Sequence, residues 1–296
     1  MTTKNCIING LKVLALSFFI TSCSDDDESN NSTSNLTLNI QKLENLGTNY
    51  RYEGWLMVNG NPISTGTFTV NASGVLSQTS FPVAKSTLSL AAKFVLTIEP
   101  YPDTNAAPSN TKILAGDFSS NAASLTIGAP EALGTNFTAA TGKYVLATPS
   151  DGMNNNEKSG IWFLGALPPT AGLSLPTLPT GWKYEGWVVI NNTPVSTGTF
   201  TNAAAADAFS GYSGTMGVPA FPGEDFVLNA PMGLTFPTDL SGGKAVISVE
   251  PFPDNSPMPF LLKPLATDIP AMAMDHTIYN MSNNAVTTNP TGTASR

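Results

Sequence analysis

The chain has 296 residues, of which 41% are hydrophobic and only 11% are charged. That length suits two domains of ordinary size, and the apolar content is too high for a disordered chain. The formal net charge of −8, with no basic cluster in the sequence, argues against nucleic acid and anionic lipid as partners.

Cysteine and histidine are scarce. Cys6 and Cys23 both lie ahead of the expected folded part, and His276 is the single histidine. Structural disulfides, thiolate or multi-histidine metal sites and a cysteine nucleophile are therefore not expected in the folded part. We expect no metal, no cofactor and no catalytic residue.

The first 22 residues are typical of a secretory signal peptide. Lys4 and Lys12 flank the start of an apolar run at 11–20, which is too short to span a bilayer. The sequence Ile-Thr-Ser-Cys at 20–23 resembles a bacterial lipobox, which implies that Cys23 is lipidated and becomes the first mature residue. The alternative is an ordinary signal peptide in which this cysteine is incidental.

Residues 23–35 are predicted to form an acidic, flexible tether. Ser24 after the cysteine resembles lipoproteins that are sent to an outer membrane. The acidic run at 25–28 resembles the export tag of surface lipoproteins in Bacteroidetes-type bacteria, with a solvated spacer as the alternative. The expected location is the outer membrane at the cell surface, or else its periplasmic face.

One segment of the sequence is repeated. Residues 52–69 read YEGWLMVNGNPISTGTFT and residues 184–201 read YEGWVVINNTPVSTGTFT, with 12 of 18 positions identical. We interpret this as two copies of one domain, at 36–167 and 180–296, joined by a Pro-rich linker at 168–179.

Each copy of the stretch predicts a β-hairpin. Asn59-Gly60 is a strong turn signal, and Asn191-Asn192 preserves the turn because Asn also tolerates positive φ. Apolar residues on both faces of the first strand, such as Trp55 and Leu56, indicate a strand that is covered on both sides or crosses to an interface.

A second shared block lies at 93–103 and 244–254, where a strand is stopped by Pro100 or Pro251. The offset between the copies grows from 132 to 151 residues, so copy two carries a 19-residue insertion between Thr201 and Lys244. With 25 Gly and 23 Pro in the chain, many short strands are expected, and the predicted fold is all-β with two tandem β-sandwich-like repeats.

Copy one ends in a second predicted hairpin, with strands at 142–148 and 161–164. Thr141-Gly142 aligns with Thr291-Gly292, close to the last residue, so copy two has no counterpart of the hairpin's second strand. One interpretation is that the strand at 161–164 belongs spatially to copy two.

The two blocks together resemble the extracytoplasmic C-terminal domain of anti-sigma-K factors. The resemblance covers about 70 residues of each copy and rests on Tyr-Glu-x-Trp, a Pro turn, Gly-Thr-Phe and a later Glu-Pro. In copy one these are Tyr52, Glu53, Trp55, Pro62, Gly66, Thr67, Phe68, Glu99 and Pro100; in copy two they are Tyr184, Glu185, Trp187, Pro194, Gly198, Thr199, Phe200, Glu250 and Pro251. The resemblance implies a compact β-sandwich-like domain outside the cytoplasm.

This chain departs from those regulators in ways that bear on function. They hold a sigma factor through a cytoplasmic domain and a membrane-spanning helix, and neither is expected here. A lipidated chain outside the cytoplasm is not expected to contact a sigma factor directly. The resemblance therefore implies the fold of this family and not its activity.

Glu99 and Glu250 occupy equivalent strand ends. We interpret them as acids that face water or cap the following turn, with a weak cation site or a glycosidase-like carboxylate pair as alternatives. His276 follows Asp275, but no Gly-x-Ser-x-Gly nucleophile motif accompanies it. The repeated Trp and Tyr residues are expected to pack in the core, with a sugar-stacking platform as the alternative.

The insertion region at 203–243 is the expected place for specific binding, because long loops on a rigid scaffold often carry it. A larger lid over the core of copy two is the alternative. The candidate ligand-binding residues there are Phe209, Tyr212, Phe221, Glu224 and Asp225.

The sequence therefore favours a non-catalytic, lipid-anchored protein that binds or senses an extracytoplasmic protein or glycan. The lipid on Cys23 is expected to attach the protein to the outer membrane. A structural or adhesive spacer and an envelope-polymer hydrolase are the alternatives.

Overall fold

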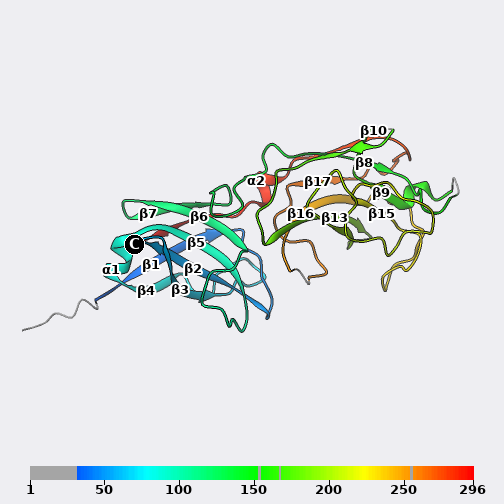
Figure 1. Ribbon diagram of the computed structural model, residues 1–296. Coiled ribbons are helices and arrows are strands. Elements are labelled where there is room, and N and C mark those ends of the chain that lie inside the picture. Colours follow the sequence, from blue (N-terminus) through cyan, green and yellow to red (C-terminus); the bar gives the residue numbers. More distant parts are fainter. Residues whose placement is uncertain (1–31, 153–154, 167, 254–255) are drawn as a thin grey trace, which may run out of the picture. The chain divides into compact units, whose positions relative to one another are not determined.

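The computed structural model describes residues 32–152, 155–166, 168–253 and 256–296. Cys23 and most of the expected tether lie outside the described residues. The described chain belongs to one compact unit, Ser32–Arg296. Its regular secondary structure consists almost entirely of antiparallel strands (Figure 1), which confirms the all-β class. The helices in this part are short, namely α1 (Lys85–Leu90), α2 (Ala285–Thr288) and the 3-10 turn Glu157–Ser159.

Eight strands form the first sheet, in the order β3-β2-β5-β6-β7-β19-β1-β4. They are β1 (Thr33–Gln41), β2 (Tyr50–Val58), β3 (Asn61–Phe68), β4 (Ser80–Ala84), β5 (Ala91–Pro100), β6 (Lys112–Ser119), β7 (Ala122–Thr126) and β19 (Thr291–Ser295). β1 begins at Thr33, before the expected end of the tether at 35, because the backbone of its first residues pairs with β4.

Strands β8 to β18, which include the end of copy one and the expected linker, form shorter sheets together with copy two. One runs β12-β8-β9-β15 with β18 also paired to β8, a second runs β14-β13-β16-β17, and β10 pairs with β11. The strands are β8 (Thr141–Leu146), β9 (Gly160–Trp162), β10 (Leu164–Ala166), β11 (Thr170–Ala171), β12 (Leu173–Ser174), β13 (Trp182–Ile190), β14 (Thr193–Phe200), β15 (Gly223–Asp225), β16 (Lys244–Pro251), β17 (Leu265–Asp268) and β18 (Tyr279–Met281). The expected linker at 168–179 thus contains two strands.

The repeated hairpin forms as predicted in both copies, as β2–β3 and β13–β14. Asn59 and Gly60 have φ of 50° and 80°, and Asn191 and Asn192 have φ of 50° and 65°. Positive φ at both central positions is the geometry of a type I′ turn, whose twist matches that of the flanking strands.

Each hairpin also contains a β-bulge at the glycine of its Glu-Gly-Trp motif. A Cβ atom on Gly54 would lie 2.9 Å from the ring of Phe94, and one on Gly186 would lie 2.8 Å from the ring of Phe163. Glycine is repeated here because an aromatic ring packs directly on the strand.

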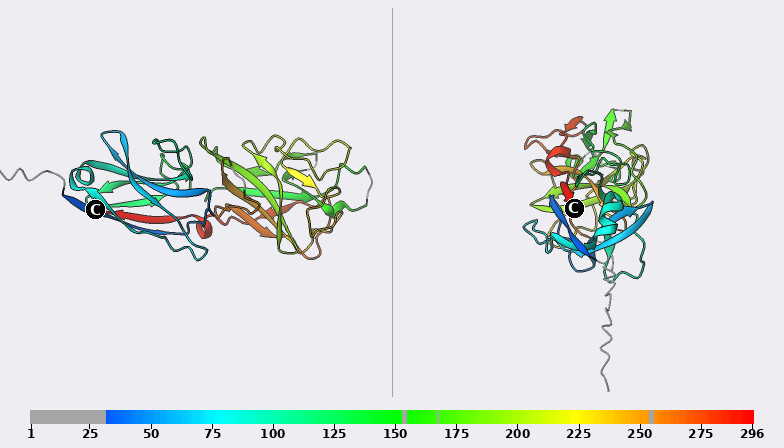
Figure 2. Two further views of the ribbon diagram at one scale, coloured as in Figure 1. Left: turned by 90° about the horizontal axis from the view of Figure 1, so that it is seen from below. Right: turned by 90° about the vertical axis from the view of Figure 1, so that its left-hand side faces the viewer.

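The last strands of the two copies are exchanged. β19, from the end of copy two, lies between β1 and β7 in the sheet of copy one. β8, its sequence counterpart in copy one, lies between β12 of the expected linker and β18 of copy two. Figure 2 shows the red C-terminal strand along the blue N-terminal strand. The boundaries of the sequence repeats, 36–167 and 180–296, are therefore not the boundaries of the sheets.

β9 confirms the interpretation that 161–164 belongs to copy two, because it pairs with both β8 and β15. Its neighbour Phe163 is fully buried on Gly186, in the place that Phe94 takes on Gly54 in copy one. The position in copy two that corresponds to Phe94 is Ala245. The exchanged hairpin thus supplies the ring that the copy-two strand lacks.

Both faces of β2 are covered, as the sequence indicated. Leu56 belongs to the main apolar core, and Trp55 packs on the opposite face with Val95, Ala115 and Ala132. Ala132 comes from the loop after β7, which closes this face of the sheet.

Candidate ligand-binding site

The repeated Glu, Trp and Ser residues form an internal polar network. Glu53 accepts a hydrogen bond from the Ser64 hydroxyl, and the Trp55 indole donates to Thr97 Oγ1 at 2.8 Å. In copy two the Ser196 hydroxyl donates to Glu185, and Trp187 donates to Ser248 Oγ at 2.8 Å. Burial raises the pKa of Glu53, against the effect of the Ser64 hydrogen bond.

These residues are therefore parts of the scaffold. Tyr52, Tyr184 and both indoles are buried, which favours core packing over a sugar-stacking platform. The exposed surface does not include their rings.

Glu99 and Glu250 are also buried, at the ends of β5 and β16. Glu99 accepts the backbone N–H of Ser109 at 2.9 Å, and Glu250 accepts that of Phe260 at 2.9 Å. Each carboxylate caps the loop that follows its strand, as one interpretation expected, but neither faces water. Through these hydrogen bonds, each acid holds the loop that follows its strand, near the place where the two copies meet.

A cavity of about 740 Å³ lies at this meeting place. Its lining comes from residues within 44–50 and 98–111 of copy one and from residues within 180–181, 250–253 and 256–260 of copy two. This volume lies within the range of small-molecule sites in proteins. The cavity exists because the two copies bring equivalent strand ends together.

The lining combines apolar surface with uncharged hydrogen-bonding groups. The larger apolar side chains are Leu46, Tyr50, Ile98, Phe252 and Phe260. The uncharged polar residues are Asn45, Thr48, Asn49, Ser109, Asn110, Thr111, Thr180 and Ser256. Lys183 Nζ lies 3.7 Å from the ring centroid of Phe252 and covers one face of that ring.

The charged lining residues are Glu44 and Glu250. Glu44 reaches across from copy one and accepts the backbone N–H of Leu261 at 2.5 Å. Lys263 lies behind the lining and donates to the Pro259 and Phe260 carbonyls. Burial lowers the pKa of Lys263, while the charges of Glu44 and Glu250 oppose that shift. Among the described lining residues there is no Lys, Arg or His.

The insertion region holds a second group of acids. Glu224 and Asp225 lie in β15 and are fully buried. Asp225 accepts the Trp162 indole N–H and the Ser150 backbone N–H, both at 2.7 Å, and Ser213 donates to Glu224. Burial raises the pKa of Glu224 to about 7 and also raises that of Asp225. Neither acid is placed to contact a ligand at the surface.

Two of the three candidate aromatic residues of this region, Tyr212 and Phe221, are partly buried. Phe221 packs beside Val145, Trp162 and Leu164, and Tyr212 packs against Phe226 and Phe236. Phe209 is 40% exposed and touches Tyr212 edge-on at 4.9 Å. The structure thus joins Phe209 with Tyr212 and separates both from Phe221. The arrangement favours the lid interpretation of 203–243.

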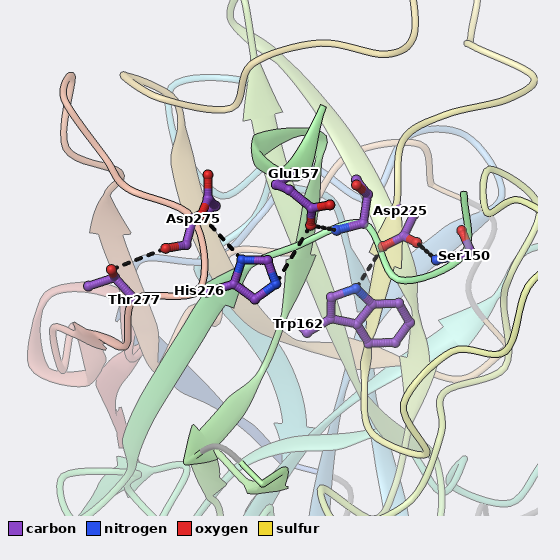
Figure 3. A network of polar contacts seen from close by, with 8 residues as sticks. Ser150, Glu157, Trp162, Asp225, Asp275, His276 and Thr277 are labelled. Atoms are coloured by element: carbon purple, nitrogen blue, oxygen red, sulfur yellow. Dashed lines mark hydrogen bonds and ion pairs between the residues drawn. The ribbon is translucent and has the colours of Figure 1, made fainter. Parts of the chain in front are cut away.

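His276 lies between two carboxylates (Figure 3). Its Nδ1 is 3.2 Å from Asp275 Oδ1, and its Nε2 is 3.7 Å from Glu157 Oε2. Within the described residues, no Ser or Cys side chain contacts this ring. The ring is half exposed, and each of its nitrogens faces a carboxylate oxygen.

Sequence reasoning missed the cavity residues Asn110, Thr180 and Phe252. Asn110 and Thr180 lie in loops with no motif, whereas Phe252 directly follows the repeated Glu-Pro of the second shared block. The three residues come together only through the contact between copies. The repeated Glu-Pro strand ends were the one signal that pointed to this place.

No protein-family model matches the sequence, and none of the curated proteins or solved structures compared with it is similar. The described residues contain no group of three or more His, Cys, Asp or Glu side chains that could hold a metal ion. In the described part of the chain, every helix is too short or too polar to cross a membrane.

Proposed function

We propose that this protein is a non-catalytic binding protein, anchored in the outer membrane by lipid on Cys23, and that its ligand occupies the cavity between the two copies. The observation that carries the proposal is the cavity itself, with its size, its mixed lining and its position where the two copies meet. Sites of this kind occur preferentially at domain interfaces.

The domains are, in this proposal, of the anti-sigma-K type in architecture and not in activity. Their repeated residues form the hydrogen bonds and core contacts of the fold. Buried scaffold residues can be shared by domains with unrelated functions.

Two measurements test the binding function. Nile red, a neutral apolar dye, should gain fluorescence with purified residues 24–296. The exposed lining residue Thr48 changed to Trp should reduce this gain, whereas Thr79→Trp, at an exposed position outside the lining, should not. Equal fluorescence from both variants contradicts binding in the cavity. Turnover of peptidoglycan or envelope polysaccharide that is lost in Glu250→Gln would instead establish the hydrolase.

The anchor is tested separately. Cells fed an alkyne fatty acid should label the wild type and the Cys6→Ala variant, and Cys23→Ala should abolish the label. Proteolysis of intact cells then separates display on the surface from the periplasmic face. A label that survives Cys23→Ala refutes the anchor without affecting the cavity.

A structural spacer is the second candidate, and the strand exchange favours it. Because β8 and β19 each complete the other copy, the two copies are joined by backbone ladders in addition to the chain connection. A spacer predicts a stable protein partner in a cross-linked pull-down from cells, and no small ligand in the cavity.

A further inference from the structure

The charged residues in the lining of the cavity between the copies are all of one sign. Its two charged lining residues, Glu44 and Glu250, are both acidic, and its described lining has no basic residue. A carboxylate, phosphate or sulfate would meet a lining that carries two carboxylates and no cation. The neighbouring cations are already engaged, since Lys263 donates to the Phe260 carbonyl beside both acids and Lys183 lies on the ring of Phe252. Burying such a charge unpaired is strongly unfavourable.

The acids of the lining are already bound to protein groups. Glu250 accepts the Phe260 N–H and the Ser248 hydroxyl, and Glu44 accepts the Leu261 N–H. Lys263 lies close enough to both acids for their charges to act on it. A cationic ligand would therefore compete with Lys263 for the two acids. The gain in binding free energy from a positive charge on the ligand is small for this reason.

The remaining groups suit an uncharged ligand that both donates and accepts hydrogen bonds. Asparagine amides and threonine or serine hydroxyls do both, as sugar hydroxyls do. Asn45, Asn49 and Asn110 are all exposed lining residues. Asn45 Oδ1 accepts the Gly47 N–H and Asn49 Oδ1 accepts the Thr48 hydroxyl, and these exposed local bonds can be exchanged for bonds to a ligand. Half-exposed Phe252 and partly buried Tyr50 add aromatic surface on which the C–H face of a sugar ring can lie.

From these properties we infer that the cavity binds a neutral, hydroxyl-rich oligosaccharide. This inference rests on the proposed binding function and adds the class of ligand. The aromatic and apolar residues contact the faces of the sugar rings, and the amides and hydroxyls bind the hydroxyl groups around the edges of those rings.

The test is isothermal titration of purified residues 24–296 with tetrasaccharides of three charge types. The neutral set is maltotetraose, cellotetraose, xylotetraose and mannotetraose; the anionic probe is tetragalacturonate and the cationic probe is the tetramer of glucosamine. At least one neutral probe should bind, and tetragalacturonate should not. Thr48→Trp and Phe252→Ala should each weaken the neutral probe by about tenfold or more, and Thr79→Trp should leave it within about twofold.

The other outcomes overturn one proposal or both. Preference for the glucosamine tetramer or for tetragalacturonate, lost in Thr48→Trp, refutes the neutral class but keeps the binding function. Neutral binding that Thr48→Trp does not change refutes the cavity as the site. Nile red binding sensitive to Thr48→Trp, without binding of any sugar, refutes the ligand class alone. Absence of both Nile red and sugar binding refutes both proposals.

Discussion

Phe163 offers a sharp test of the exchanged packing. Its side chain is fully buried on Gly186, and Ala245, at the position of Phe94, is buried in the same core. Replacing Phe163 by Ala should lower the free energy of unfolding by about 3–5 kcal/mol, the usual range for a buried Phe that leaves a cavity. Replacing Ala245 by Phe alone should cost about 1–3 kcal/mol, because the space is already filled.

The double variant Phe163→Ala/Ala245→Phe should be more stable than Phe163→Ala by about 2 kcal/mol or more. The new ring would then approach Gly186 from β16, as Phe94 approaches Gly54 from β5. Urea unfolding followed by tryptophan fluorescence measures this, because three of the four tryptophans lie in β9 and β13. Leu90→Ala, at an exposed position, is the control and should change stability by less than about 0.5 kcal/mol. Additive losses in the double variant would refute the equivalence of the two rings.

Three further predictions concern buried polar groups and the exchanged strand. Ser64→Ala should cost about 1–3 kcal/mol in urea unfolding, since it leaves the buried Glu53 carboxyl without this donor; Thr79→Ala is the exposed control. Burial raises the pKa of Glu224 from its ordinary 4.5 to about 7, so folding favours the protonated carboxyl. Its contribution to the free energy of unfolding is therefore fully present below pH 4.5 and is lost as the pH rises through 7. Glu224→Gln should therefore reduce the fall in stability between pH 5 and pH 8 by about 1–3 kcal/mol, and an unchanged pH profile would contradict this assignment. Deleting residues 291–296 should speed hydrogen exchange in β1 and β7, because both strands lose β19 as their shared neighbour. β13 and β16 should stay protected. Equal protection of β1 in the full-length and the shortened protein would show that β19 does not lie between β1 and β7.

The features that the sequence predicted correctly are set by local chemistry. The Asn-Gly and Asn-Asn turns form because these residues accept positive φ, and this decides the hairpins in both copies. β5 and β16 end at Pro100 and Pro251, because proline lacks the N–H that a ladder needs. The duplication itself is visible in any alignment of the chain with itself.

The assignment of Glu224 and Asp225 shows where local reasoning stopped. Their loop is rich in Gly and Pro and looks open in sequence, yet both acids are fully buried in β15. They are held there by Trp162, Ser150 and Ser213, which lie up to 75 residues away. Burial of a polar group depends on such distant partners, and a loop's composition does not reveal them.

By itself, then, the sequence determined the number of copies, the all-β class, the hairpin turns and the ends of the main strands. Only the tertiary structure decided that β8 and β19 change places, because backbone ladders hold a strand of either copy equally well and carry little sequence information. It also decided the cavity, whose lining comes from separate segments of both copies. A site made where two domains meet depends on distances between residues that no single stretch of sequence contains.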